Sequence, residues 1–600
     1  MRIEYKNKRL ENILITANAL TSAMVVASFV LLFGGFKKEL LPEFVLYTIQ
    51  VVLLCIFVAE KIIRFSNSAS KIDFWRANWF EIPLLLMLGI TAIGAGRWFA
   101  PLKAEAVEVR HFAVGIYLVI QVVAKLCRTS VNMAASGKSP TQTLIASFLV
   151  LIISGAGLLM LPRASTGENL SFVDALFTAT SATCVTGLIV KDTGQDFSLM
   201  GQIVILTLIQ LGGLGIVVFG AVFALLLGQA LSLRESVAMQ DLLSARTLSR
   251  IGNIIAFIFI GTVFIEAVGA VSLLGMWNDV PGRIANTQQQ WFCSIFHSIS
   301  AFCNAGFSLF SDSFKSYNKS WGVYVIVCPL IILGGLGFGV LYDLVITATD
   351  RVKRVLKKLF FKRYRLSMET PKRLRLQTKI VLSVSAGLIL LGMLAILVFE
   401  RYANGSNSPE KTGVLGALFQ SITARTAGFN TVDISAMSAS SKFILILLMF
   451  IGGSPGSTAG GIKTVTLAVV IMTAVAALRK RQEVEMFKRS VRIVVVGRAV
   501  TVTLLFLAVL FTSTLALSIT ENSNGFALSE IMFETASALG TVGLSTGVTG
   551  PLTELTDAGK LIIIATMLIG RLGPLTLLAA LTFDLKPARY NYPDEAVIVG

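Results

Sequence analysis

Four short segments share one pattern, and this repetition restricts the fold more than any other feature of the sequence. In each segment, a stretch rich in aromatic, serine and threonine residues precedes two small or polar residues, a glycine, and then leucine or phenylalanine. The four glycines are separated by 119, 122 and 115 residues, and they are Gly187, Gly306, Gly428 and Gly543. A unit that recurs at such a period indicates four copies of one structural element within a single chain.

The fourth copy indicates what these turns do. It reads Thr541-Val542-Gly543-Leu544, and Thr-Val-Gly is the central part of a potassium-channel filter sequence. In such filters, backbone carbonyl oxygens replace the water shell of the ion, and glycine lets successive carbonyls turn toward one axis. We therefore expect an ion filter built from four turns. Its candidate residues are Val185, Thr186, Gly187, Leu188, Asn304, Ala305, Gly306, Phe307, Thr426, Ala427, Gly428, Phe429, Thr541, Val542, Gly543 and Leu544.

The composition places these turns in a membrane protein. Of the 600 residues, 54% are hydrophobic and only 14% are charged, whereas a soluble protein carries roughly 25% charged residues. The net charge of +18 does not indicate a nucleic-acid partner, because the basic residues lie in short segments between apolar spans, as in cytoplasmic loops. No clustered histidines and cysteines, Ser/His/Asp set or paired carboxylates suggest catalysis. We expect no enzyme and no organic cofactor.

The predicted fold class is an all-α polytopic membrane protein with four helix–pore-loop–helix repeats around a pseudo-fourfold pore. About four further spans, near 12–34, 43–64, 79–97 and 111–128, precede the repeats, and basic loops place the N-terminus in the cytoplasm. Each repeat is expected to consist of a span, a half-span helix, a filter turn and a second span. The predicted divisions are 1–140 for the additional helices, 141–250 for repeat 1, 251–378 for repeat 2 with a basic linker, 379–490 for repeat 3, and 491–600 for repeat 4 with the C-terminal tail. The linker is expected to face anionic lipid or to dock a partner.

One segment of the third repeat cannot continue a helix. Five glycines and one proline occur among the ten residues 452–461. Irregular backbone at membrane depth is tolerated only where it lines a cavity or is buried in protein, so we place this segment at the pore. A phosphate-binding loop is a weaker alternative, because Ile462 separates the last glycine from Lys463.

Three charged residues fall inside apolar segments. An arginine within a span usually faces a polar interior, which favours a pore position for Arg571 over one at the inner interface. Arg425 and Glu534 lie near the third and fourth filter glycines, and each is costly if unpaired. We expect these two residues to form an ion pair that supports the filter. Asp174 and Asp192 flank the first turn, where they either attract cations or belong to a solvated loop.

Several motifs together resemble the Trk/Ktr/HKT superfamily of potassium transporters, most closely its bacterial TrkH/KtrB membrane subunits. The matching segments are 183–188, 424–431, 452–461 and 570–574, and the resemblance covers about residues 141 to 600. It implies K⁺ as the transported ion, a homodimer in contact with membrane lipid, and a cytosolic ring of nucleotide-binding regulators of the TrkA/KtrA type. It also implies a location in the bacterial cytoplasmic membrane.

The resemblance further assigns a gate beneath the filter. The gate residues that it implies are Gly452, Gly453, Ser454, Gly456, Ser457, Thr458, Ala459, Gly460 and Gly461, with Arg571 as an electrostatic barrier. Glycine at all four filter positions favours potassium over sodium by the pattern of the family. A sodium-conducting or sodium-coupled transporter remains the alternative within transport, and a membrane sensor with a vestigial pore is the alternative of another class.

Overall fold

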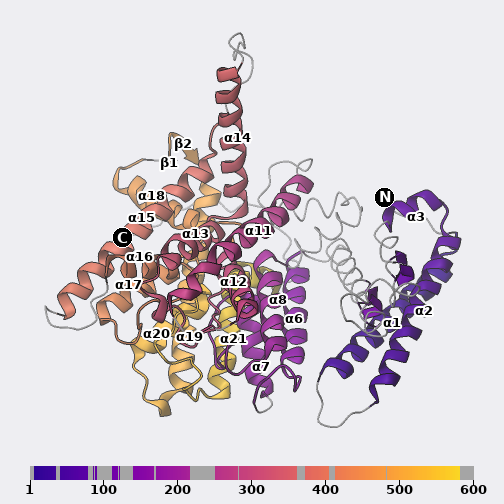
Figure 1. Cartoon of the computed structure of the whole chain (residues 1–600). Coiled ribbons are helices and arrows are strands. Elements are labelled where there is room, and N and C mark those ends of the chain that lie inside the picture. Colours follow the sequence, from indigo (N-terminus) through magenta and orange to yellow (C-terminus); the bar gives the residue numbers. More distant parts are fainter. Residues whose placement is uncertain are drawn as a thin grey trace, which may run out of the picture.

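The structure is a computed structural model of the whole chain, in which helices form almost all of the regular structure (Figure 1). It describes residues 6–34, 41–78, 140–215, 251–360, 372–404 and 413–581, apart from short gaps at 168–169, 281–282, 285, 371 and 482, together with scattered residues between 85 and 121. The expected spans at 79–97 and 111–128 therefore lie mostly outside the described residues.

The described helices follow the same order in four successive parts of the chain: an outer helix, a short pore helix and an inner helix. The first part contains α6 (Pro140–Leu159), α7 (Phe172–Cys184) and α8 (Leu199–Leu214). The second contains α11 (Ile251–Leu273), α12 (Thr287–Cys303), α13 (Cys328–Leu336) and α14 (Phe338–Phe360). The third contains α15 (Leu376–Asn404), α16 (Val414–Thr423), α17 (Ala439–Phe450) and α18 (Thr464–Leu478). The fourth contains α19 (Ile493–Thr520), α20 (Leu528–Gly540), α21 (Asp557–Leu572) and α22 (Pro574–Leu581).

Smaller elements complete the described fold. The helices α1 (Lys8–Phe33) and α2 (Glu43–Asn67) pack against each other beside the main body, and the short α3 (Lys71–Ala77) follows them (Figure 1). Between α18 and α19, an antiparallel hairpin pairs β1 (Val484–Met486) with β2 (Arg489–Val491). Single turns of 3-10 helix occur at Leu274–Asp279, Lys315–Tyr317 and Asn522–Asn524, and a π-helical turn at Val323–Val327 precedes α13.

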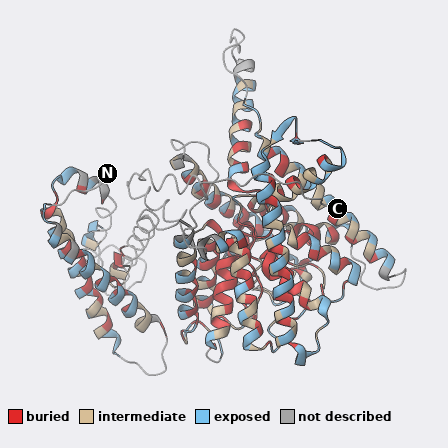
Figure 2. Cartoon of the chain, turned by 180° about the vertical axis from the view of Figure 1, so that it is seen from behind, coloured by how far each residue is buried: buried red, intermediate tan, exposed pale blue. Residues whose placement is uncertain are grey.

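Length and composition make several helices suitable as membrane spans. Among the described residues, five helices are long and apolar enough to cross a membrane, or six if the bent pair α13 and α14 counts as one span. Buried residues concentrate in the centre of the helical body, and many outward-facing side chains on its helices are exposed (Figure 2). Exposed apolar residues such as Ile260, Phe264, Leu391 and Phe511 lie on the outer helices. A surface of this kind suits a hydrocarbon environment, as expected for an all-α polytopic membrane protein.

The inner helices are interrupted in all four repeats, whereas the sequence predicted a break only in the third, at the glycine-rich segment 452–461. Gly215, Gly337 and Gly573 end α8, α13 and α21 with φ of 82°, 85° and 84° and ψ of 128°, 143° and 134°. A side chain makes this backbone conformation unfavourable, so glycine at these positions allows the chain to leave the helix. The bend between α13 and α14 reaches 103°. The third inner helix breaks by another means, the loop 451–463 between α17 and α18.

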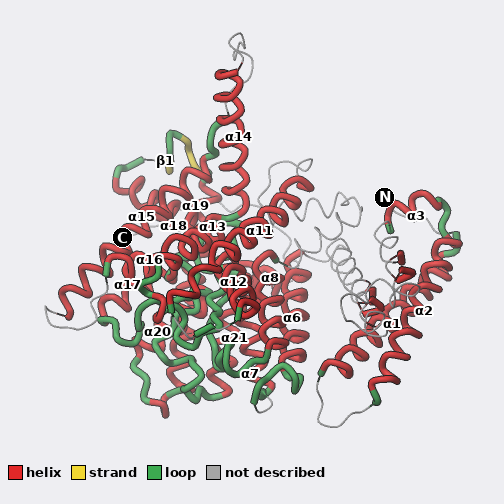
Figure 3. The backbone as a smooth tube through the Cα atoms, viewed as in Figure 1, coloured by secondary structure: helices red, strands yellow, loops and turns green. Residues whose placement is uncertain are grey.

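Carboxylates at the ends of three outer helices fix the starts of the inner helices. Glu400 accepts hydrogen bonds from the backbone and hydroxyl of Ser438, which is the N-cap of α17. Glu521 accepts the hydroxyl of Thr556, the N-cap of α21. The hydroxyl of Ser320, just before the second inner helix, donates to Asp279. Many of the connecting loops gather at the end of the body opposite the projecting α14 (Figure 3).

Candidate functional site

The four repeated turns adopt closely similar backbone conformations. The residue two positions before each filter glycine has a positive φ of 60°, 60°, 78° or 50°, and the glycines themselves have φ of 90°, 70°, 82° and 94°. Left-handed backbone is costly for residues with a side chain and persists where the surroundings impose it. The four residues that precede the glycines by two positions are Val185, Asn304, Thr426 and Thr541.

The four glycines form a closed ring. A Cβ atom on Gly187 would lie 2.4 Å from the carbonyl oxygen of Ala305, and one on Gly306 would lie 2.8 Å from that of Ala427. The same atom on Gly428 would lie 2.3 Å from the oxygen of Val542, and on Gly543 it would lie 2.3 Å from that of Thr186. Each glycine thus meets the carbonyl before the next glycine, and the fourth turn meets the first. The close approach leaves no space for a side chain at any of the four positions.

Glycines of the inner helices pack directly behind the pore helices. Cβ atoms on Gly212 and Gly334 would each lie 1.9 Å from a carbonyl oxygen, those of Thr183 and Phe302. On Gly570 the corresponding distance is 2.0 Å to the oxygen of Leu539. These glycines let the inner helices approach the filter closely.

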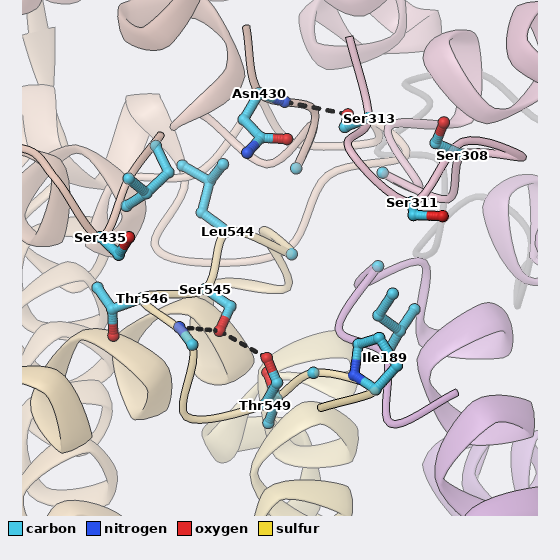
Figure 4. Close-up of a pocket in the computed structure, with 18 of the residues that line it drawn as sticks. Ile189, Ser308, Ser311, Ser313, Asn430, Ser435, Leu544, Ser545, Thr546 and Thr549 are labelled. Carbon is cyan, nitrogen blue, oxygen red and sulfur yellow. Dashed lines mark hydrogen bonds between the residues drawn. The ribbon is translucent and has the colours of Figure 1, made fainter. Parts of the chain in front are cut away.

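A cavity of about 340 Å³ opens on one side of the glycine ring. Residues from all four repeats face it, including Ile189, Ser308, Asn430 and Ser545 (Figure 4). Serine, threonine and asparagine groups supply most of the labelled polar atoms. The arrangement forms a polar mouth above the ring.

The charges around this mouth are largely paired. Lys315 lies 3.3 Å from Asp433, and both line the cavity. Partial burial opposes ionisation of Asp433, but the Ser435 hydroxyl and the Lys315 ammonium outweigh it, so the pKa of this carboxyl lies below its usual value. Asp174 pairs with Lys560 at 2.6 Å, and Asp192 accepts backbone hydrogen bonds in its own turn. Both aspartates are buried, so neither belongs to a solvated loop.

The glycine-rich segment 452–461 lies on the other side of the ring and contacts several inner helices. The backbone N–H of Ser454 donates to Gly335 at 3.0 Å, and that of Phe338 donates to Gly456 at 3.0 Å. A Cβ on Gly460 would lie 2.2 Å from the hydroxyl oxygen of Thr541, at the base of the fourth turn. The segment follows a helix and not a strand, unlike a phosphate-binding loop. The segment therefore packs between the second inner helix and the base of the fourth turn.

Two cations hold this segment through its carbonyl oxygens. Arg571 donates to the carbonyl of Thr458 and, from its other terminal nitrogen, to Gly212 at 2.5 Å. Lys463 donates to the carbonyls of Ala459 at 2.6 Å and Gly460 at 3.3 Å. Sequence reasoning assigned no role to Lys463, although a lysine two residues after a glycine-rich segment, in an apolar stretch, was a usable signal. Arg571 thus lies between the glycine-rich segment and the first inner helix, among backbone carbonyls.

The expected ion pair between Arg425 and Glu534 is wrong. Arg425 donates to the hydroxyl of Ser385 at 3.2 Å and lies at the limit of hydrogen bonding from the carbonyl of Gly452. Glu534 accepts the hydroxyls of Ser545 and Thr549. Neither residue forms an ion pair within the described part of the chain. The reason is the direction of the side chains: Arg425 points to the glycine-rich segment, whereas Glu534 contacts the loop that lines the mouth.

Comparison with known proteins identifies the family. The family model TrkH, described as a cation transport protein, matches residues 108–589. The chain belongs to the TrkH family of cation transport proteins. The match begins before residue 141, the start that the sequence motifs suggested, and so includes the expected span at 111–128.

Individual proteins similar to this chain include two potassium uptake proteins and one solved structure. The Ktr system potassium uptake protein B of Bacillus subtilis is 39% identical over 476 residues, covering 77% of this chain and 97% of that protein. The potassium/sodium uptake protein NtpJ of Enterococcus hirae is 36% identical, with 77% and 97% covered. The crystal structure of the potassium transporter TrkH from Vibrio parahaemolyticus is 21% identical, with a TM-score of 0.57, and covers 85% of this chain and 99% of that one. This last likeness concerns the fold alone.

Proposed function

We propose that this member of the TrkH family carries potassium ions across the cytoplasmic membrane of a bacterium through the ring of four glycine turns. The observation that supports this proposal is the closed contact of each turn with the carbonyl of the next. Backbone carbonyls arranged around one axis can replace the water shell of a cation without covalent chemistry. Two relatives named for potassium uptake point the same way.

Rescue of a potassium-uptake-deficient bacterial strain tests the proposal. The wild-type chain, expressed with its regulator, should restore growth on low-potassium medium, and Gly543→Ser should not. Rubidium influx should exceed sodium influx in the same cells. Sodium influx without rubidium influx would favour the sodium-conducting alternative. The relative from Enterococcus hirae is named a potassium/sodium uptake protein, which is why this alternative is tested. No flux of either ion would favour a sensor with a vestigial pore.

We infer that the segment 452–461 and Arg571 form the gate of this pathway. Hydrogen bonds from Arg571 join Thr458 of the segment to Gly212 of the first inner helix, directly beneath the ring. A fixed positive charge there opposes the passage of a cation. Arg571→Ala should increase cation leak in potassium-starved cells, and an unchanged flux would contradict this role.

The assembly is part of the same proposal. We expect a homodimer, with the N-terminus and the basic linker in the cytoplasm, and a ring of nucleotide-binding regulators on that side. The projecting, strongly basic α14 is placed to contact regulators or anionic lipid (Figure 1). Mass measurement of the purified complex with and without the regulator would test both the dimer and the partner.

A further inference from the structure

Two pore helices hold the serine beyond their own filter glycine. In the second repeat, the hydroxyl of Ser308 lies 3.1 Å from Nε2 of His297. In the fourth repeat, the hydroxyl of Ser545 lies 3.0 Å from Oε2 of Glu534 and 2.9 Å from the carbonyl oxygen of Thr549, and these two acceptors share its one proton. In both repeats the acceptor lies nine residues before the glycine, and the serine lies two residues after it. The two contacts therefore occupy equivalent positions, with an imidazole as the pore-helix partner in one repeat and a carboxylate in the other. We call this contact between the pore helix and the serine a brace.

The protonation of His297 follows from its neighbours. Its Nδ1 lies 2.8 Å from the carbonyl oxygen of Cys293, which can only accept, so Nδ1 carries the proton. Nε2 is then the acceptor for Ser308 and faces the backbone N–H of Leu309 at 3.4 Å. The ring is fully buried and stacks on Phe310 with centroids 5.2 Å apart. This packing gives the imidazole one orientation, toward the exit of the filter turn.

The brace in the fourth repeat is equally enclosed. Glu534 is completely buried, and its second oxygen accepts the hydroxyl of Thr549. Ser545 in turn accepts from the backbone N–H of Gly547 at 3.0 Å (Figure 4). The carboxylate thus fixes both ends of the loop 545–549, which lines the mouth.

The other two repeats are held differently. In the first repeat, Thr178 occupies the position of the acceptor, but its hydroxyl donates to the backbone carbonyl of Asp174 in its own helix at 2.9 Å. The corresponding residue beyond the glycine is Ile189, which has no polar side-chain atom. In the third repeat, Asn430 exchanges hydrogen bonds with the loop of the second repeat, through the Ser313 hydroxyl and the Phe314 N–H. The pore-helix braces therefore belong to the second and fourth repeats, which are diagonal in the ring.

We propose that His297 and Glu534 are positioning residues that hold the mouth-side edge of the filter in these two diagonal repeats, and so determine how well it discriminates potassium from sodium. Discrimination depends on the position and number of carbonyls around the ion. If the serine two residues beyond the glycine loses its hydrogen bond to the pore helix, the backbone carbonyls of that filter turn can shift. This inference rests on the proposed function, because it concerns the selectivity of the same pathway.

Serine and acceptor variants test the inference through the ratio of rubidium to sodium influx. Ser545→Ala and Glu534→Leu should each lower the ratio by roughly 3- to 10-fold, the range for the loss of one buried hydrogen bond. The double variant should lower it by less than the product of the two single effects, because both changes remove the shared contact between Ser545 and Glu534. Glu534→Gln keeps an acceptor oxygen for Ser545 and should retain most of the ratio. Ser308→Ala and His297→Phe form the matching set in the second repeat.

Thr178→Val is the matched control, because this hydroxyl bonds only within its own helix among the described contacts. It should leave the ratio unchanged. The inference is overturned if the serine variants keep the wild-type ratio, or if their only effect is a lower melting temperature. A wild-type chain without rubidium influx would instead contradict the proposed function. The two failures are therefore distinguishable in one assay.

Discussion

At the scale of single residues, the filter glycines are required for space as well as for conformation. Each has a positive φ, and each faces a neighbouring carbonyl at a distance that no Cβ atom tolerates. Backbone atoms form the opposing surface, so the contact cannot be relieved by rotation of a side chain. The approach at Gly306 is 2.8 Å and is therefore less severe than the 2.3–2.4 Å at the other three.

Alanine substitutions should reproduce this order. Gly187→Ala, Gly428→Ala and Gly543→Ala should abolish rubidium influx, whereas Gly306→Ala should retain a measurable fraction. The influx is normalised to the amount of protein in the membrane. Gly157→Ala is the control, because a Cβ atom there meets nothing within 4 Å. Equal activity of all four filter variants would contradict the ring contacts.

Asp312 provides a pH-dependent contact in the loop that follows the second filter turn. Partial burial opposes its ionisation, but hydrogen bonds from Arg283 and Ser316 outweigh this effect, so its pKa lies below the usual value. Arg283 also lies over the rings of Phe310 and Tyr317, with its guanidinium carbon 4.5 and 5.6 Å from the ring centroids. A lowered pKa contributes stability above the pKa of the unfolded chain, near 4, and this contribution is lost as the pH falls through the folded value.

Asp312→Asn should therefore lower the melting temperature in detergent at pH 7, with the difference from wild type shrinking as the pH falls below about 4. Differential scanning fluorimetry across this range measures the effect. Asp557→Asn is the comparison, since Asp557 is largely exposed and makes only a long contact of 3.6 Å with Lys560. A difference that stays constant with pH would argue against an ionic contribution from Asp312.

At the scale of helices, the carboxylate caps in three repeats connect the end of the outer helix to the start of the inner helix of the same repeat. Glu521 ends α19 and accepts the hydroxyl of Thr556, whose oxygen also accepts the N–H of Gly559 at 3.0 Å. A Cβ on Gly559 would lie 2.2 Å from a Glu521 oxygen, so the carboxylate is pressed against the start of α21. Thr556 therefore joins the end of α19 to the start of α21.

Thr556→Val should destabilise the protein by about 1–3 kcal/mol, because it removes an N-cap and leaves a buried carboxylate short of a donor. Thermal unfolding in detergent, followed by tryptophan fluorescence, measures the change. Thr501→Val is the control, since its exposed hydroxyl bonds only to Gly497 in its own helix. Equal melting temperatures for the two variants would contradict the capping role.

At the scale of the whole molecule, the ring separates two environments that the sequence does not distinguish. Glu534 belongs to the mouth side, with Ser545 and Thr549 as partners. Arg425 belongs to the side of the glycine-rich segment 452–461, where it reaches Ser385 on α15 and the carbonyl of Gly452. The two charges share no hydrogen-bond partner, although both lie close to the filter in sequence.

The effects of Arg425→Gln and Glu534→Gln should therefore be independent. Their fold-changes in rubidium influx should multiply in the double variant, within the roughly 0.5 kcal/mol expected for residues without a shared partner. The influx of all four proteins in a double-mutant cycle gives this coupling. A coupling energy above about 1 kcal/mol would indicate direct contact between Arg425 and Glu534 and would contradict their separation in the structure.

The sequence alone determined the number and kind of units in this protein. Hydropathy is a property of local composition, so it predicted the membrane class, and the glycine spacing predicted four related turns. The same reasoning anticipated the break at 452–461, because glycine and proline are unfavourable in any helix regardless of its neighbours. Each of these features depends on residues that are adjacent in the chain.

Tertiary structure alone decided which atoms meet. The breaks at Gly215, Gly337 and Gly573 were not predicted, because a single glycine is tolerated within a membrane helix and only its φ and ψ show that the helix ends there. The separation of Arg425 from Glu534, and the braces from His297 and Glu534 to their serines, depend on side-chain directions set by packing. Pairing between residues on different segments is a property of the folded chain, which is why charge and spacing alone did not specify it.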